Sequence, residues 1–393
     1  MPNFKCKKLI NLNFPRQSEG VEFLWKACNE KVELVLTRFE NENFFIQIKQ
    51  DEKGNWIIKG DKHSKPSKIG YLQKALLEFK KNFCDEILSE AVALKSTRLV
   101  EKSPLIASNL KELLSKLETK RQIYIEIGFG SGRHLLFQAK KNPEIFIVGI
   151  EIYTPALEQV AKLAKEQKLD NVLLIKSDAR LLLSVLKSNF IDKIFLHFPV
   201  PWDKKPHRRV VGEKFAKECQ RVLKQDGCFE VRTDSRLYFD FTLETFLNFT
   251  HLQAQIHKNK DLQISSKYED RWKKQQKDIY DLIIKIKDES LQKQDLSDFG
   301  LEELQLNQND LQKIKTQFKN ETFAKENCFL HFENIYQKDE ELVIKIAFGA
   351  FNQPEHCYLI LNDSMTFLFD EPFKTEENLQ ALNLLKEKIK NYL

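Results

Sequence analysis

Residues 124–135 read YIEIGFGSGRHL. The stretch begins with the apolar run of a buried strand, turns on three glycines and continues as a helix. Because glycine has no side chain, Gly128, Gly130 and Gly132 allow a ligand to approach the backbone at the start of that helix. This order predicts the first unit of a doubly wound α/β sheet. The turn alone leaves two alternatives open, a nicotinamide dinucleotide as the ligand or a tight turn without a ligand.

The pattern around the glycine turn extends over residues 96–287, where strands alternate with helices. This predicts an α/β domain with a Rossmann-like, seven-stranded sheet. Strands are expected near residues 122–127, 145–151, 172–177, 192–198 and 227–233, with two further antiparallel strands near residues 251–257 and 279–285. Helices are expected at about residues 132–141, 155–168, 179–187 and 212–224.

The two ends of the chain have a different pattern. Residues 1–95 and 321–393 contain short alternating runs such as VELVLTRF and ELVIKIAFGAF, together with helical stretches. We therefore predict a small α+β accessory module at each end. Residues 288–320 are rich in Gln, Lys, Asp and Asn, which indicates a linker with some helix.

Composition restricts the class of protein. The 393 residues are 42% hydrophobic, enough for a buried core, and the net charge of +6 permits a polyanionic partner without requiring one. The seven cysteines include no CxxC pair, which favours reduced cytosolic thiols and predicts no metal site. We see neither a signal peptide nor a membrane-spanning run, so we expect a cytoplasmic protein that does not bind membranes. The oligomeric state is left open.

Three carboxylates at successive strand ends favour S-adenosylmethionine over a dinucleotide. Glu126 lies inside the end of the first strand, just before the glycines, where it would attract a cationic amino group and repel a pyrophosphate. Glu151 ends the second strand, where a carboxylate can accept hydrogen bonds from both ribose hydroxyls. Asp178 ends the third, where an adenine amino group would lie. Any one of them could be a solvated acid, but three in succession predict a cofactor site.

The fourth strand leads into FPVPWDKKPHRR, residues 198–209. Two prolines make this loop rigid, and Trp202 offers a face for stacking. The basic residues that follow are Lys204, Lys205, His207, Arg208 and Arg209. A solvated basic loop is one interpretation. Contact with nucleic-acid phosphates is favoured because the loop also carries an aromatic residue next to the expected site of methyl transfer.

The motifs EIGFGSG, GIE, DA, FPVPWDKK, TD and SKYE, in this order, resemble those of the bacterial tRNA (guanine-N7-)-methyltransferase family. The resemblance covers about residues 120–287. It implies that Glu126, Glu151 and Asp178 contact S-adenosylmethionine, and that tRNA is the partner, with the guanosine at position 46 of the variable loop as the usual target. The substrate-binding residues that it implies are Lys204, Asp234, Ser266, Lys267, Tyr268 and Glu269.

One position departs from the family pattern FPDPW, because Val200 stands where the family has an acid. Guanine N7 has a free lone pair and carries no proton, so its methylation requires placement and desolvation but no general base. Loss of the acid is therefore compatible with activity. Asp203 is a candidate for a substitute carboxylate. The alternatives are a methyltransferase acting on another RNA or on an amine, and an inactive RNA-binding module.

Overall fold

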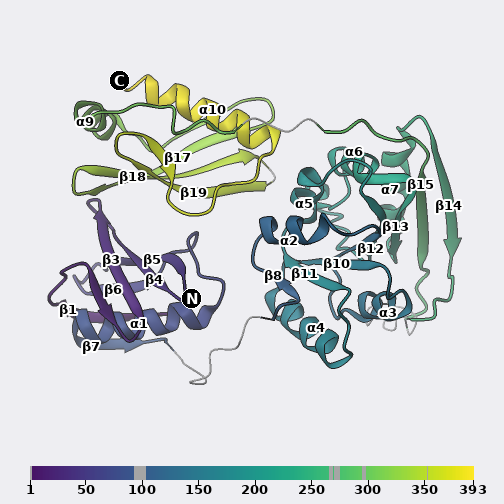
Figure 1. Cartoon of the computed structure of the whole chain (residues 1–393), viewed down its shortest axis with the longest axis horizontal. Helices are drawn as coiled ribbons and strands as arrows, with labels where there is room; N and C mark the ends of the chain where they lie inside the picture. The colour runs from purple at the N-terminus through teal and green to yellow at the C-terminus, as the bar shows by residue number, and fades with distance from the viewer. Residues whose placement is uncertain (1, 93–102, 265–268, 270–274, 294–297, 352) are drawn as a thin grey trace. The chain divides into compact units, whose positions relative to one another are not determined.

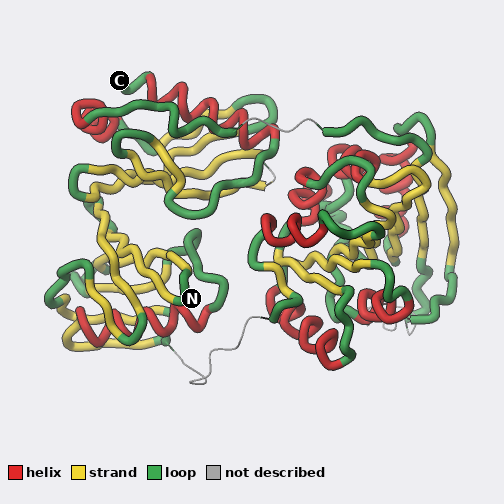
Figure 2. The backbone as a smooth tube through the Cα atoms, viewed as in Figure 1, coloured by secondary structure: helices red, strands yellow, loops and turns green. Residues whose placement is uncertain are grey.

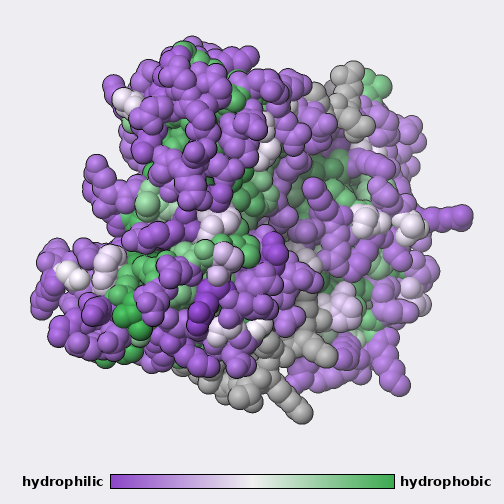
Figure 3. All heavy atoms as spheres, turned by 60° about the vertical axis from the view of Figure 1, so that its left-hand side comes forward, coloured by the Kyte–Doolittle hydropathy of each residue, from purple (hydrophilic) through white to green (hydrophobic). Residues whose placement is uncertain are grey.

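The computed structural model describes residues 2–92, 103–264, 269, 275–293, 298–351 and 353–393 (Figure 1). The chain divides into two compact units, residues 101–295 and a unit made of residues 1–100 with 296–393. In the described ranges, no helix is long and apolar enough to cross a membrane. Hydrophilic side chains cover most of the face drawn in Figure 3.

The unit of residues 101–295 is built on one sheet with the strand order β14-β15-β13-β12-β9-β10-β11-β8. Its strands are β8 (Ile106–Ala107), β9 (Ile123–Ile127), β10 (Phe146–Glu151), β11 (Val172–Lys176), β12 (Ile191–His197), β13 (Leu223–Thr233), β14 (Leu252–Lys258) and β15 (Tyr280–Ile286). The pairs from β8 to β13 are parallel, and β15 pairs antiparallel with β13 and β14. The α/β class is confirmed. The sheet has eight strands instead of the seven predicted, because the short β8 pairs with β11.

Helices lie on both faces of this sheet (Figures 1 and 2). They are α2 (Leu110–Leu117), α3 (Arg133–Lys141), α4 (Thr154–Glu166), α5 (Ala179–Val185), α6 (Glu213–Val222) and α7 (Arg236–Leu247), with a 3₁₀ turn, η1 (Pro206–Arg208). On one face, Leu135 of α3 and Val160 of α4 pack in a common core with Leu174. On the other, Phe229 of β13 stacks on Phe246 of α7. The carboxyl ends of the parallel strands thus meet at one edge, beside the glycine turn.

The second unit joins the two ends of the chain in one sheet, with the order β20-β19-β18-β17-β3-β4-β5-β6-β1-β7. Strands from the first end are β1 (Asn3–Leu9), β2 (Arg16–Ser18), β3 (Val21–Cys28), β4 (Glu33–Phe39), β5 (Glu42–Gln50), β6 (Trp56–Gly60) and β7 (Cys84–Glu90). Those from the other end are β16 (Glu321–Ala324), β17 (Phe329–Lys338), β18 (Glu341–Ala350), β19 (Gln353–Leu361) and β20 (Met365–Phe367). The helices are α1 (Ile69–Phe83), α9 (Gln308–Gln317) and α10 (Glu376–Lys390).

This unit differs from the prediction of two separate end modules, residues 1–95 and 321–393. Gln337 of β17 pairs with Cys28 of β3, so the two ends continue one sheet. Phe45 from the first end also packs edge-to-face on Tyr358 from the other, with ring centroids 4.9 Å apart. Each end has its own alternating pattern, but alternation does not reveal the partner of an edge strand.

The stretch predicted as a linker, residues 288–320, also differs from the prediction. Leu301, Leu311 and Ile314 are buried in the core that α10 shares with β17 and β18. The polar composition of the stretch reflects its exposed side, whereas its few apolar residues are spaced to reach the core. Residues 296–320 therefore belong to the unit formed by the chain ends, whereas residues 288–295 belong to the other unit.

Candidate active site

The glycine turn has the backbone that glycine permits. Gly128, Gly130 and Gly132 all have positive φ, and Gly132, at φ +70°, precedes the first residue of α3. A Cβ on Gly132 would lie 2.4 Å from Cγ2 of Val160, which is fully buried. A Cβ on Gly130 would meet nothing nearer than the carbonyl oxygen of Gly128, at 4.0 Å. Gly132 therefore allows close packing against α4, whereas Gly130 borders open space.

The three acids predicted as cofactor ligands lie at the ends of neighbouring strands. Glu126 of β9 is 3% exposed and is aligned with Gly149 of β10. Glu151 ends β10 and accepts hydrogen bonds from the amide nitrogens of Gly130 and Ile152, at 3.3 and 2.8 Å. Asp178 follows β11 and caps α5, accepting from the backbone nitrogen and the guanidinium of Arg180. The structure thus brings the acids and the glycine turn to one edge.

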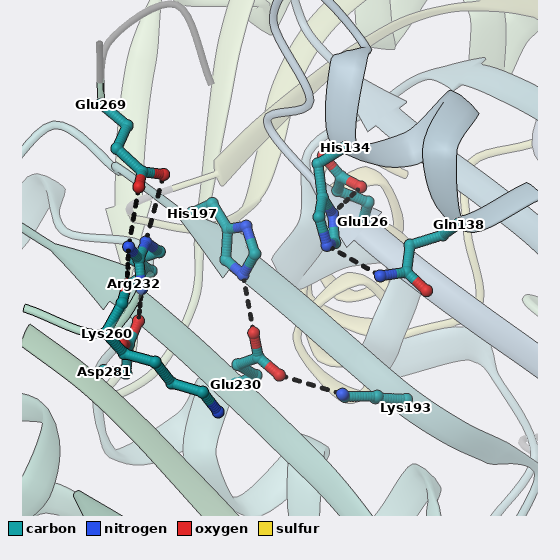
Figure 4. Close-up of polar contacts among 10 residues, drawn as sticks. All are labelled: Glu126, His134, Gln138, Lys193, His197, Glu230, Arg232, Lys260, Glu269 and Asp281. Carbon is teal, nitrogen blue, oxygen red and sulfur yellow. Dashed lines mark hydrogen bonds and ion pairs between the residues drawn. The ribbon is translucent and has the colours of Figure 1, made fainter. Parts of the chain in front are cut away.

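Glu126 is also the first member of a polar chain that the sequence analysis did not identify (Figure 4). His134 Nδ1 lies 2.7 Å from Glu126 Oε2, and the His134 ring lies 4.4 Å from that of His197. His197 Nε2 is 3.1 Å from Glu230, which also pairs with Lys193 at 2.9 Å. The strand residues of this set share one sheet face, and α3 brings His134 to it. The signal in the sequence was the presence of charged or histidine side chains within the buried strands β9, β12 and β13.

The charges in this polar cluster shift the pKa values of His134 and Glu230. Burial disfavours a protonated imidazole, but the attraction of Glu126, its hydrogen bond and the attraction of Glu230 together outweigh burial and raise the pKa of His134. Burial would raise the pKa of Glu230, but the hydrogen bond from His197 and the attraction of Lys193 hold it well below its ordinary value. The buried face is therefore stabilised by ionic pairs.

The pair of His134 and Glu126 predicts a pH dependence of stability. A raised pKa of His134 contributes stability that is complete below the unfolded pKa of about 6.5 and is lost as the pH rises through the folded pKa. We expect the destabilisation caused by His134→Gln to be largest at acid pH and to shrink as the pH rises. Urea unfolding of both proteins from about pH 5 to pH 9 measures it. His251→Gln, at an exposed histidine, is the control. Equal destabilisation at every pH would contradict the prediction.

A second buried cluster surrounds Arg232, also undetected in the sequence (Figure 4). Its side chain is fully buried, and Nη2 donates to Glu269 Oε1 and to the Lys260 carbonyl, both at 2.8 Å. Nη1 donates to Asp281, the residue opposite Arg232 on β15. Among the described residues, no group donates to the other oxygen of Asp281. Burial raises the pKa of Asp281.

The loop of residues 198–209 has an unusual backbone. Phe198 and Trp202 have φ values of +51° and +47°, a region that bulky residues rarely adopt and that often marks functional sites. The amide of Phe198 donates to the carbonyl oxygen of Arg232 at 2.7 Å. Arg209 holds the far side of the loop by donating to the Pro201 carbonyl at 2.8 Å.

The remaining side chains of this loop differ in their partners and in their exposure to solvent. The guanidinium of Arg208 lies 5.1 Å from the ring of Trp202, so the two stack. Lys204 is exposed. Asp203 pairs with Arg209 at 3.3 Å. Val200, in the position of the family acid, is 61% exposed.

The other predicted substrate residues fall into three groups. Asp234 follows β13 and accepts from Lys277 at 2.9 Å. Glu269 is turned inward to Arg232 and is 1% exposed. The predictions for Ser266, Lys267 and Tyr268 lie outside the described residues. Glu269 therefore lies against Arg232, near the end of β13, and Arg232 stands two residues before Asp234 in the sequence.

Comparisons with known proteins give relatives that match over nearly the full length of the chain. A family model described as "Putative methyltransferase" matches residues 120–282. A protein of Campylobacter jejuni named tRNA (guanine-N(7)-)-methyltransferase is 59% identical over 390 residues, 99% of each chain. Proteins with the same name from Campylobacter fetus and Wolinella succinogenes are 43% and 37% identical. They cover 98% of this chain and 98% and 99% of their own lengths.

Proposed function

Because this chain belongs to the tRNA (guanine-N7-)-methyltransferase family, we propose that it uses S-adenosylmethionine to methylate the guanosine at position 46 of the tRNA variable loop. The enzyme methylates N7 of guanine in tRNA. The observation that carries the proposal is the meeting of the glycine turn with Glu126, Glu151 and Asp178 at the ends of three adjacent strands. The matches to these relatives cover 98–99% of this chain and so include the unit formed by its ends.

The residues at the turn fit S-adenosylmethionine. The space beside Gly130 admits a ligand against the backbone. The Glu126 carboxylate would attract the ammonium group of the methionine part, Glu151 would accept from the ribose hydroxyls, and Asp178 would accept from the adenine amino group. When bound, the cofactor supplies an electrophilic methyl group on a sulfonium.

The acceptor side needs placement more than proton transfer. Guanine N7 attacks with a free lone pair, so no residue has to remove a proton, and Val200 is compatible with the reaction. The strained loop that starts at Phe198 is held by Arg232 and Arg209, which gives it a fixed shape for orienting the base. We assign Asp203 a structural role, in which it fixes the shape of this loop through its ion pair with Arg209, and we do not assign it the role of a base.

The basic side chains of the loop and the residues after β13 would hold the tRNA. Lys204 is exposed and free to contact a phosphate, and Arg208 with Trp202 offers a stacked cationic surface. Asp234 and the segment containing Glu269 would contact the guanosine, as the family resemblance implies. The Asp234 carboxylate suits guanine, because the Watson–Crick edge of the base presents N–H donors.

Mapping of the product tests the proposal. We expect unmodified tRNA incubated with the protein and S-adenosylmethionine to acquire 7-methylguanosine at position 46, detected by chain cleavage at that base. A transcript with adenosine at position 46 is the control and should acquire no 7-methylguanosine. Formation of 7-methylguanosine at another position would contradict the proposed target. A methyl group on an exocyclic amine would favour the alternative methyltransferase. Calorimetry that detects no cofactor binding would favour the inactive RNA-binding module.

A further inference from the structure

The Glu126 carboxylate has one occupied oxygen and one open oxygen. Its Oε2 lies 2.7 Å from His134 Nδ1, and among the described residues His134 is its only hydrogen-bond partner. In the same part of the chain, the fully buried side-chain atoms without a partner are His257 Nε2 and Asp281 Oδ2, so the unbonded Oε1 of Glu126 keeps contact with solvent. The glycine turn beside it also borders open space, since a Cβ on Gly128 would meet no atom within 4 Å. This carboxylate is therefore accessible to a small ligand although it is nearly buried.

His134 lies among titratable groups of three strands (Figure 4). Glu126 of β9 contacts its Nδ1, and the ring of His197 of β12 faces its ring with centroids 4.4 Å apart. Lys193 of β12 opposes a positive charge on the ring, and Glu230 of β13 favours one. Burial lowers the pKa of His134, but the two carboxylates outweigh burial and raise it. A proton on this ring is therefore held by negative charge, chiefly that of Glu126.

Gln138 can serve His134 in either protonation state. Its amide nitrogen lies 3.0 Å from His134 Nε2. With the nitrogen in this place, Gln138 donates to a neutral ring, and with the amide reversed, its oxygen accepts from a protonated ring. Asn142 donates to Gln138 Oε1 at 3.1 Å and to the Gln138 carbonyl oxygen at 3.0 Å, so it keeps the second bond when the amide is reversed. The proton on Nε2 can therefore leave without depriving a buried polar group of its partner.

A second cation at Glu126 would change this balance. A protonated His134 and the ammonium group of S-adenosylmethionine would both depend on one carboxylate, in a nearly buried place where water screens their mutual repulsion little. An α-amino group has an ordinary pKa of about 7.7–8.0, against about 6.5 for histidine. The imidazole is therefore the group that gives up its proton.

We propose that His134 releases its Nε2 proton to solvent when Glu126 receives the ammonium group of S-adenosylmethionine, so that cofactor binding is coupled to pH. The inference rests on the proposed function, which places the ammonium group at Glu126. Nδ1 keeps its proton and donates to Glu126 in both states. Because a protonated His134 competes with the cofactor for one carboxylate, cofactor affinity falls as the pH falls through the pKa of this histidine.

Calorimetry in two buffers of different ionisation enthalpy measures the protons released on binding. At pH 6.5 we expect S-adenosylmethionine to displace roughly half a proton or more per molecule bound. Methylthioadenosine lacks the ammonium group, so it should displace none. The affinity of the unchanged protein for S-adenosylmethionine should rise roughly 10-fold from pH 5.5 to pH 7.0, a range in which the ammonium group of the ligand stays largely protonated.

His134→Gln separates this role from a structural one. The variant should bind S-adenosylmethionine without releasing a proton, and its affinity should change less than about 2-fold over the same pH range. At pH 5.5 it should bind the cofactor more tightly than the unchanged protein, because it carries no competing charge. Loss of a residue that only supports the fold would instead weaken binding at every pH. His251→Gln, at an exposed histidine of the same unit, is the matched control and should keep the proton release.

Three results would overturn the inference. They are binding of S-adenosylmethionine to the unchanged protein without proton release, an equal release with methylthioadenosine, and a pH dependence of affinity that persists in His134→Gln. Failure of the proposed function is distinct, because S-adenosylmethionine would then give no binding heat or no 7-methylguanosine in tRNA. If His134→Gln fails to fold, the comparison of the two ligands on the unchanged protein still decides the question.

Discussion

Glu126→Gln is expected to weaken binding of S-adenosylmethionine about 100-fold. Glu126 is 3% exposed, so its negative charge meets a cationic ligand with little screening by water. Glutamine keeps the shape of the side chain, and its amide oxygen can still accept from His134, 2.7 Å away. The substitution therefore removes the charge and leaves the packing, and the loss of affinity reports the attraction of the ammonium group.

Ligand fragments make this test specific. S-adenosylhomocysteine keeps the ammonium group, so Glu126→Gln should weaken its binding as much as that of S-adenosylmethionine. Methylthioadenosine lacks the amino-acid part, and its affinity should not change. Titration calorimetry measures all three, and Glu144→Gln, at an exposed carboxylate in the same unit, is the matched control. An equal loss for methylthioadenosine would mean that the whole site is disturbed, and unchanged affinity for all three would exclude Glu126 from it.

Gly132→Ala is expected to lower the free energy of unfolding of residues 101–295 by about 3 kcal/mol. The new Cβ would lie 2.4 Å from Cγ2 of Val160, a stiff, fully buried side chain, and the residue would keep a φ of +70°. Gly130→Ala shares the positive φ but meets no close atom, so we expect a cost of about 1 kcal/mol. Its larger effect should be on cofactor affinity, because its methyl group enters the space assigned to the ligand.

Urea unfolding and calorimetry separate these two glycines. Gly132→Ala combined with Val160→Ala should cost less than the sum of the single changes, because the smaller side chain makes room for the new methyl group. If Gly130→Ala destabilised the unit as much as Gly132→Ala, or if both left the free energy of unfolding unchanged, the roles assigned to the two glycines would be wrong.

The central unit was predictable because its signals are local. The strand that contains Glu126 and the helix that begins at Arg133 are encoded by apolar periodicity and by glycine, which do not require knowledge of distant residues. Parallel strands then bring their carboxyl ends together by topology alone, so the positions of Glu151 and Asp178 follow.

The partners of buried charges could not be predicted in the same way. Arg232 and Glu269 are 37 residues apart, and nothing in their local sequence indicates that one neutralises the other. Glu126 was correctly placed at a strand end, but its contact with His134 depends on how α3 lies on the sheet. The prediction of a separate module at each end missed the shared sheet for the same reason, because the partner of an edge strand is selected only in three dimensions.

That shared sheet also constrains how the protein is made. Ribosomes release the chain from its first residue, and β17 emerges only after all of residues 101–295 have been synthesised. Until then β3 has no partner on the side that β17 takes, and Phe45 lacks Tyr358, against which it later packs. Residues 101–295 can therefore fold during translation before β17 is made. The unit formed by the chain ends can be completed only after β17 has been synthesised, and until then β3 is an exposed edge strand.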